Sequence, residues 1–266
     1  MFKLSRFNKL AAVTALVIVG AFASITYASH SWGGYHWART SNPFTLKLGD
    51  NLSSAWKPRL ATTTSDWSLS SVLDAVIVPG ISQGNCRPTN GRVEVCNKAY
   101  GYNGWLGLAQ IWVSGNHIYQ GVTKMNDTYF NTPTYNTLAW RQSVICQEVG
   151  HTLGLDHQDE NFSNPNLGTC MDYTSDPSGA LYNQLDNEHP NQHDYDQLAI
   201  IYSHLDGITT IKQTLQNAKA KGADPDLEGR AEWGKEIRKS ENGRNSLYER
   251  DLGKGQKVYT FVIWAN

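Results

Sequence analysis

The run from Gln147 to His157 (QEVGHTLGLDH) constrains this chain more than any other stretch. On a helix, residues four apart lie nearly above one another, so Gln147 and His151 face the same side. Glu148 lies one residue after Gln147 and three before His151. Gly154 is placed to end the helix and turn the chain, which brings His157 back toward the same point. The run therefore predicts a helix whose end gathers an amide, a carboxylate and two imidazoles.

This set of residue types favours a metal-dependent hydrolase. Zinc in hydrolases typically takes three protein ligands and a water molecule, and it lowers the pKa of that water toward neutrality. A carboxylate beside the water can remove its proton and later deliver it to a leaving amine. The pattern predicts peptide hydrolysis through a metal-activated water, with Glu148 as general base and acid. His151, His157 and Gln147 are the predicted metal ligands.

Met171 follows His157 by fourteen residues, in a Cys-Met-Asp-Tyr run. Together with the helix motif, it resembles the HExxHxxGxxH signature and Met-turn of metzincin-clan zinc metallopeptidases, and among them the matrixin-like catalytic domains. The resemblance covers Phe44 to Leu205 as an architecture and implies an α+β fold with a twisted, mostly parallel sheet, an active-site helix and Met171 beneath the metal. It also implies an extended polypeptide substrate paired with an edge strand, here Leu106 to Val113. Tyr173 matches a tyrosine that some members bring near the metal.

The chain departs from this pattern at one position, because Gln147 stands where the first histidine is expected. An amide oxygen is an unusual and weaker zinc ligand than imidazole. Three outcomes are open. Gln147 coordinates weakly and leaves an active enzyme, another side chain takes the third place, or the protein binds no metal. The last outcome gives a second hypothesis of a different class, a catalytically inactive binding module on a metzincin-like fold.

The N-terminus is typical of a secretory signal peptide over residues 1–28. Lys3, Arg6 and Lys9 precede an almost wholly apolar run, and Thr26-Tyr27-Ala28 is a small-x-small cleavage site. An uncleaved membrane anchor is the alternative, since the run is just long enough to span a bilayer. We expect a secreted, extracellular or periplasmic protein with no stable membrane association after cleavage.

Four cysteines follow the predicted signal, and an even number in an exported chain indicates disulfides. Three pairings are possible. We predict the sequence-local one, Cys86–Cys96 and Cys146–Cys170. The second bridge would tie the motif helix to the segment just before Met171.

The remaining segments predict a metallopeptidase domain over 29–205, a linker or helix over 206–232 and a small C-terminal β-meander over 233–266. Alternating or β-branched runs predict strands, and spaced apolar residues predict helices. Asn90-Gly91 is a strong hairpin signal between Cys86 and Cys96. The predicted strands are 44–48, 72–78, 106–113, 118–125 and 258–264, and the predicted helices are 51–67, 137–153 and 193–204.

The formal net charge of −1 gives no sign of a nucleic-acid partner. We expect a monomer whose partner is a polypeptide substrate. Calcium is a second candidate cofactor, because Asp156 lies within the motif, Asp159 and Glu160 follow it, and matrixin-like domains often bind calcium. A solvated acidic turn is the simpler interpretation. The histidines outside the motif, such as His36 and His117, cannot be placed from the sequence, and a structural role is the simplest prediction for His117. Nine tryptophans predict a substantial aromatic core.

Overall fold

The computed structural model describes residues 30–81, 84–211, 229–240 and 245–265 as an α+β fold. Within these ranges, nine strands form one mixed sheet in the order β3-β2-β4-β6-β5-β9-β8-β7, and β1 pairs beside β6. The strands are β1 (His36–Trp37), β2 (Phe44–Asn51), β3 (Leu73–Pro79), β4 (Arg92–Lys98), β5 (Trp105–Ser114), β6 (His117–Asn126), β7 (Lys235–Lys239), β8 (Asn245–Gly253) and β9 (Gln256–Trp264). The helices are α1 (Lys57–Trp67), α2 (Asp127–Phe130), α3 (Leu138–Thr152), α4 (Gln192–Ile201) and the 3-10 turn η2 (Arg230–Glu232).

The sheet has a parallel half and an antiparallel half. Strands β3, β2, β4 and β6 run parallel to one another. From β6 onward the pairings through β5, β9, β8 and β7 are antiparallel. The expected mostly parallel sheet is therefore a mixed one.

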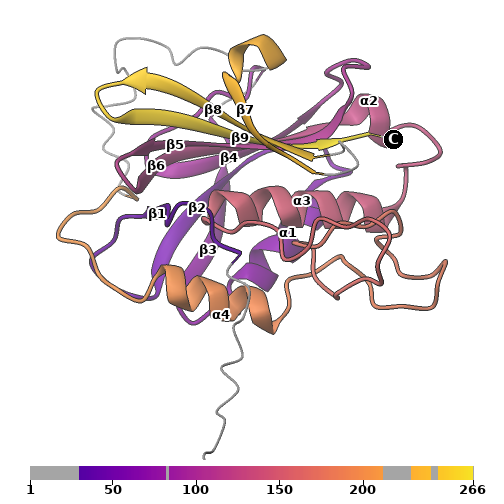
Figure 1. Cartoon of the computed structure of the whole chain (residues 1–266), viewed down its shortest axis with the longest axis horizontal. Helices are drawn as coiled ribbons and strands as arrows, with labels where there is room; N and C mark the ends of the chain where they lie inside the picture. Colours follow the sequence, from indigo (N-terminus) through magenta and orange to yellow (C-terminus); the bar gives the residue numbers. More distant parts are fainter. Residues whose placement is uncertain (1–29, 82–83, 212–228, 241–244, 266) are drawn as a thin grey trace, which may run out of the picture.

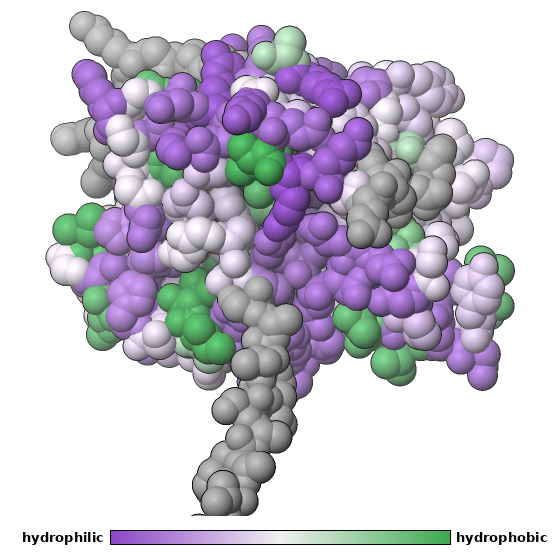
Figure 2. All heavy atoms as spheres, in the orientation of Figure 1, coloured by the Kyte–Doolittle hydropathy of each residue, from purple (hydrophilic) through white to green (hydrophobic). Residues whose placement is uncertain are grey.

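Helices α1, α3 and α4 lie against one face of the sheet, with α3 running beneath β5 and β6 (Figure 1). The main apolar core fills the space between the two layers. A second, smaller core lies on the opposite face, where the Cys86–Cys96 bridge packs near Trp105, Trp112 and Trp233. Most tryptophans are buried, as predicted, and the face in Figure 2 is mainly polar with scattered apolar groups.

The helices begin where local chemistry allows. Pro58 lies in the first turn of α1, where a missing N–H costs little. The Thr137 hydroxyl caps α3 by accepting a hydrogen bond from the Trp140 amide at 3.1 Å. At α4, Asn191 and Asp194 form a reciprocal capping box. All three helices lie within the predicted ranges to a few residues.

The hairpin predicted at Asn90-Gly91 is wrong. Gly91 does adopt a left-handed turn, with φ of 77°. The strand that follows, β4, pairs with β2 and β6 and runs parallel to both. The turn thus delivers the chain into the middle of a parallel sheet. The Asn-Gly signal marks a local reversal, but it does not determine which strand becomes the neighbour.

The assignment of Leu106–Val113 as an edge strand is also wrong. The meander strands expected after Trp233 are β7, β8 and β9, and they extend the same sheet. Strand β9 pairs with β5 from Trp105↔Trp264 to Ser114↔Gln256. Because β6 occupies the other side, β5 has a neighbour on both sides. The two partners lie some 150 positions apart in the chain, so no local pattern announces their pairing.

Both predicted disulfides are confirmed. Cys86 bonds to Cys96, and Cys146 of α3 bonds to Cys170, next to Met171. Two bridges are consistent with an exported protein. In the described ranges, no helix is both long and apolar enough to cross a bilayer. The predicted signal segment, and most of the predicted linker over 206–232, lie outside the described residues.

Gly150 lets α3 approach the segment that carries Met171. Met171 is fully buried. A Cβ at position 150 would come within 2.5 Å of the Met171 Sδ and 2.8 Å of a Trp67 ring carbon. Only a residue without a side chain fits between the helix and these two groups.

We expect Gly150→Ala to destabilise the protein although alanine is the better helix former. The helix preference would contribute about 1 kcal/mol of stability, whereas overpacking costs about 1–3 kcal/mol. Urea unfolding measures the balance. Gly207→Ala is the matched control, because no atom lies within 4 Å of the added Cβ. A Gly150→Ala variant that gains stability would contradict this packing.

Candidate metal centre

The motif residues lie at the C-terminal end of α3 and in the turn that follows. Gly154 has φ of 98°, and a Cβ there would meet the Tyr35 carbonyl oxygen at 2.2 Å. The chain therefore turns sharply at a position that only glycine tolerates, as the sequence predicted. His157 returns beside the helix, and the rings of His151 and His157 lie edge to face with centroids 4.5 Å apart.

The ring of His151 is oriented by the backbone. Its Nδ1 donates a hydrogen bond to the Leu155 carbonyl at 2.9 Å. Since that carbonyl can only accept, the proton is on Nδ1 and the lone pair is on Nε2. Nε2 is buried with no hydrogen-bond partner among the described residues. Burial, and next the charge of a protonated His157, lower the pKa of His151 well below its usual value, which favours the neutral, ligating form.

The ring of His157 is oriented by side chains. Its Nδ1 lies 3.0 Å from the Tyr173 hydroxyl and 3.4 Å from a carboxylate oxygen of both Asp156 and Glu160. Its Nε2 is buried and unpaired in the described structure. Carboxylates behind one imidazole nitrogen are the usual way in which proteins fix a histidine whose other nitrogen binds a metal. Tyr173 thus lies against the predicted ligand His157.

Gln147 is held in one orientation. Its Nε2 donates to the Cys170 carbonyl at 2.7 Å. The Cys146–Cys170 bridge keeps that carbonyl close to α3. The amide oxygen, Oε1, is buried and has no partner in the described ranges. The glutamine therefore presents an oxygen ligand while its nitrogen is satisfied.

Glu148 is fully buried, and neither carboxyl oxygen has a hydrogen-bond partner in the part of the chain described. Burial raises the pKa of Glu148 well above its usual value. It lies under β5, because a Cβ on Gly107 would come within 2.7 Å of its Oε1. Nothing in the described structure compensates a charge on this carboxylate.

The donor set passes a chemical test for zinc. A buried polar atom without a partner costs about 1–3 kcal/mol. Here the unpaired atoms are two imidazole nitrogens, an amide oxygen and a carboxyl group, all on one helix end and its turn. Histidine nitrogen is a preferred zinc ligand, and oxygen is accepted. These atoms are of the types that zinc accepts, so the predicted site residues fit the predicted metal in their chemistry.

Calcium gains no support here. Asp156 and Glu160 lie together around the His157 Nδ1, as a group of potential ligands. Arg238 of β7 makes a bidentate ion pair with Asp156 and reaches Glu160 at 3.3 Å. Burial opposes ionisation of Asp156, but the Arg238 hydrogen bonds hold its pKa well below the usual range. The guanidinium already balances these carboxylates.

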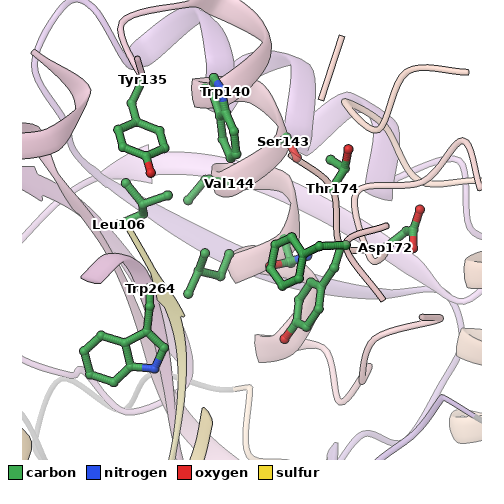
Figure 3. A pocket seen from close by; sticks show the side chains of 12 residues that line it. Leu106, Tyr135, Trp140, Ser143, Val144, Asp172, Thr174 and Trp264 are labelled. Atoms are coloured by element: carbon green, nitrogen blue, oxygen red, sulfur yellow. The ribbon is translucent and has the colours of Figure 1, made fainter. Parts of the chain in front are cut away.

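Strand β9 covers the site from above. The Phe261 ring stacks on the His151 ring at 4.1 Å with an interplanar angle of 6°. A small pocket beside Gln147 is closed on one side by Ile263 and Trp264. Figure 3 shows Leu106, Tyr135 and Trp140 around the same space. No sequence motif indicated that Phe261 or Arg238 lies at this site.

The chain matches no protein-family model and no curated protein. The case for a metal centre therefore stands on the four motif side chains and their surroundings.

Asp172, which follows Met171, has one satisfied and one unsatisfied oxygen. The Leu167 amide and the Asn187 side chain donate to Oδ2 at 2.8 and 2.9 Å. Oδ1 is buried without a partner in the described residues. Burial raises the pKa of Asp172 to about 6. The folded state thus binds this proton more tightly than the unfolded chain, where the pKa is about 3.9.

We expect Asp172→Asn to stabilise the protein above pH 6 by about 1–2 kcal/mol and to change little near pH 4. The wild-type carboxyl group is protonated near pH 4. Its contribution to the free energy of unfolding is lost as the pH rises from about 4 through 6. The asparagine oxygen can keep both hydrogen bonds to Oδ2. Urea unfolding with a chelator at both pH values tests this. Asp186→Asn, at an exposed position, is the control, and equal destabilisation at both pH values would contradict the prediction.

Proposed function

We propose that the chain is a secreted zinc-dependent endopeptidase of the metzincin type, held closed by its own C-terminal strand. The observation that carries the proposal is the set of unpaired buried atoms: Gln147 Oε1, His151 Nε2 and His157 Nε2, beside the Glu148 carboxyl group. These three side chains would hold zinc. When bound, zinc supplies Lewis-acid polarisation of the peptide carbonyl and lowers the pKa of water.

The chain's own residues would perform the proton transfers. A water oxygen adds to the carbonyl carbon of the substrate while Glu148 takes a proton from that water. Glu148 then delivers the proton to the amide nitrogen as the C–N bond breaks. Tyr173, Asp156 and Glu160 keep the His157 Nε2 turned toward the reaction centre, and the Leu155 carbonyl does the same for His151.

Strand β9 supports latency because it takes the place of an extended substrate. It pairs antiparallel with β5 along the whole strand, as a peptide would in β-augmentation. Its alternate residues Tyr259, Phe261 and Ile263 pack in the core on the helix side. A substrate would need to displace this strand to reach Glu148. Arg238 of the same meander clamps Asp156, the neighbour of His157.

We expect Arg238→Gln to raise peptidase activity. The side chain is partly exposed, so the ion pair is worth about 1 kcal/mol, and its loss would raise the open population about fivefold. The measurement is cleavage of a reduced, dye-labelled polypeptide. Arg250→Gln on β8 is the control, since Arg250 donates only to the Glu232 carbonyl among the bonds described. Phe261→Ala, which uncovers His151, should act in the same direction. Latency would be refuted by equal rates in all four proteins.

In the Arg238→Gln background, we expect Glu148→Gln to lower the cleavage rate by about 100-fold or more while zinc content is kept. His157→Ala should lower both the cleavage rate and the zinc content, and a chelator should stop cleavage. Glu188→Gln, a carboxylate far along the chain from the motif, is the control. Retained activity in Glu148→Gln would remove this mechanism.

A catalytically inactive binding module is the second candidate. Gln147 and the closed cleft favour it, because both weaken a catalytic zinc site. The two candidates differ in their response to Gln147→His in the Arg238→Gln background. A silent parent that gains zinc affinity and activity would favour the inactive module. A parent that is already active and changes little would favour a working glutamine ligand.

A further inference from the structure

A second group of potential metal ligands lies outside the motif. It consists of His36 in β1, His117 at the start of β6 and Asp206 in the loop after α4, whose ligand atoms all lie within 4.8 Å of one another. His204, in the same loop, lies beside His36 and Asp206. The parallel pairing of β1 with β6 makes His36 and His117 direct partners across the sheet. The loop after α4 passes beside β1 at the left of Figure 1 and brings the other two residues to the same place.

Four of the distances between these ligand atoms match those of a tetrahedral zinc site. The Asp206 Oδ1 lies 3.1, 3.4 and 3.6 Å from the Nε2 atoms of His117, His36 and His204. The Nε2 atoms of His36 and His204 are 3.2 Å apart. With zinc–ligand bonds of about 2.0–2.1 Å, neighbouring corners of a tetrahedron are about 3.3–3.4 Å apart. The observed distances lie around this value.

The groups behind these ligands orient them for a metal. The His36 Nδ1 donates to the Gly34 carbonyl at 2.9 Å, so its Nε2 carries the lone pair. Arg39 donates to Asp206 Oδ2 from its guanidinium at 2.9 Å and from its backbone amide at 3.1 Å. The Asp206 amide returns a bond to the Arg39 carbonyl. One carboxylate oxygen is therefore fixed by Arg39, and the other faces the three imidazoles.

Hydrogen bonds among these side chains, without a metal ion, explain the arrangement less well. The lone pair on the Nε2 of a neutral His36 can accept a hydrogen bond from the Nε2–H of His204, 3.2 Å away, but His36 then has no proton to offer the Asp206 Oδ1 at 3.4 Å. Protonating all three imidazoles would place three cations around one carboxylate that already pairs with Arg39. A divalent ion accepts lone pairs from neutral imidazoles and charge from the carboxylate without this repulsion.

We propose that His36, His117, His204 and Asp206 form a second, structural metal site that takes zinc. His36, His117 and Asp206 already form a compact group, and the half-exposed side chain of His204 would turn toward them to close the shell with a fourth ligand. Four protein ligands are the arrangement of structural rather than catalytic zinc. The ion would tie the N-terminal arm and the loop after α4 to the start of β6. The site is independent of the motif residues and needs no catalysis.

The test is zinc content and thermal stability of the full chain. His204→Ala and Asp206→Asn should each lose one zinc ion per chain relative to wild type, or bind it at least about tenfold more weakly. His204 is suited to substitution because its side chain is 51% exposed. Asn at position 206 keeps an oxygen for Arg39. The unfolding midpoint should rise with added zinc in wild type and rise less in both variants.

His189→Ala is the matched control. His189 is a similarly exposed histidine paired with a different carboxylate, Asp66. It should keep the wild-type zinc content. His157→Ala separates the two sites, because it should lose the motif's zinc and keep the ion bound by His204 and Asp206. Cobalt bound to His157→Ala should give the intense visible absorption of tetrahedral coordination.

The proposal is overturned if His204→Ala and Asp206→Asn bind as much zinc as wild type with equal affinity. It is equally overturned if the His157→Ala protein folds and binds neither zinc nor cobalt.

Discussion

The pairing of β9 with β5 is the interaction on which the rest of the structure depends. It joins the C-terminal meander to the sheet and contributes to both apolar cores, since alternate β9 residues face opposite sides. It also covers the candidate centre, because Phe261 stacks on His151. In the proposed function, the strand takes the place that a substrate would occupy. The pairing that completes the sheet is therefore also the one that covers the candidate centre.

The candidate centre shows why buried polar atoms are informative. The helix end and its turn hold four polar side chains in a nearly solvent-free space, and three of them, Gln147, His151 and His157, are each oriented by a different partner. The atoms that remain without a hydrogen bond are an amide oxygen and two imidazole nitrogens, which are types that ligate metals. The glutamine fits this logic. Its nitrogen is bonded to a carbonyl beside the Cys146–Cys170 bridge, and its oxygen is left for a cation.

Two proposed ions would have different tasks in this fold. The motif site is made by residues close in sequence and includes a general base. The other is made by three segments far apart in sequence, which only the β1–β6 pairing and the loop after α4 bring together. The ion at the motif would support catalysis. The second ion would tie the N-terminal arm and the loop after α4 to the start of β6. Each site contains an imidazole whose Nδ1 donates to a backbone carbonyl, that of Leu155 for His151 and that of Gly34 for His36.

The sequence by itself determined the features that depend on near neighbours. These include the motif helix and its glycine turn, the two local disulfides and the positions of most strands, because periodicity, capping and short loops act over a few residues. Only the tertiary structure decided which strands pair. It placed β9 beside β5, Arg238 beside Asp156, and His36 beside His117, His204 and Asp206. These contacts join segments whose separation leaves no local pattern, since sheet pairing depends on the packing of whole layers.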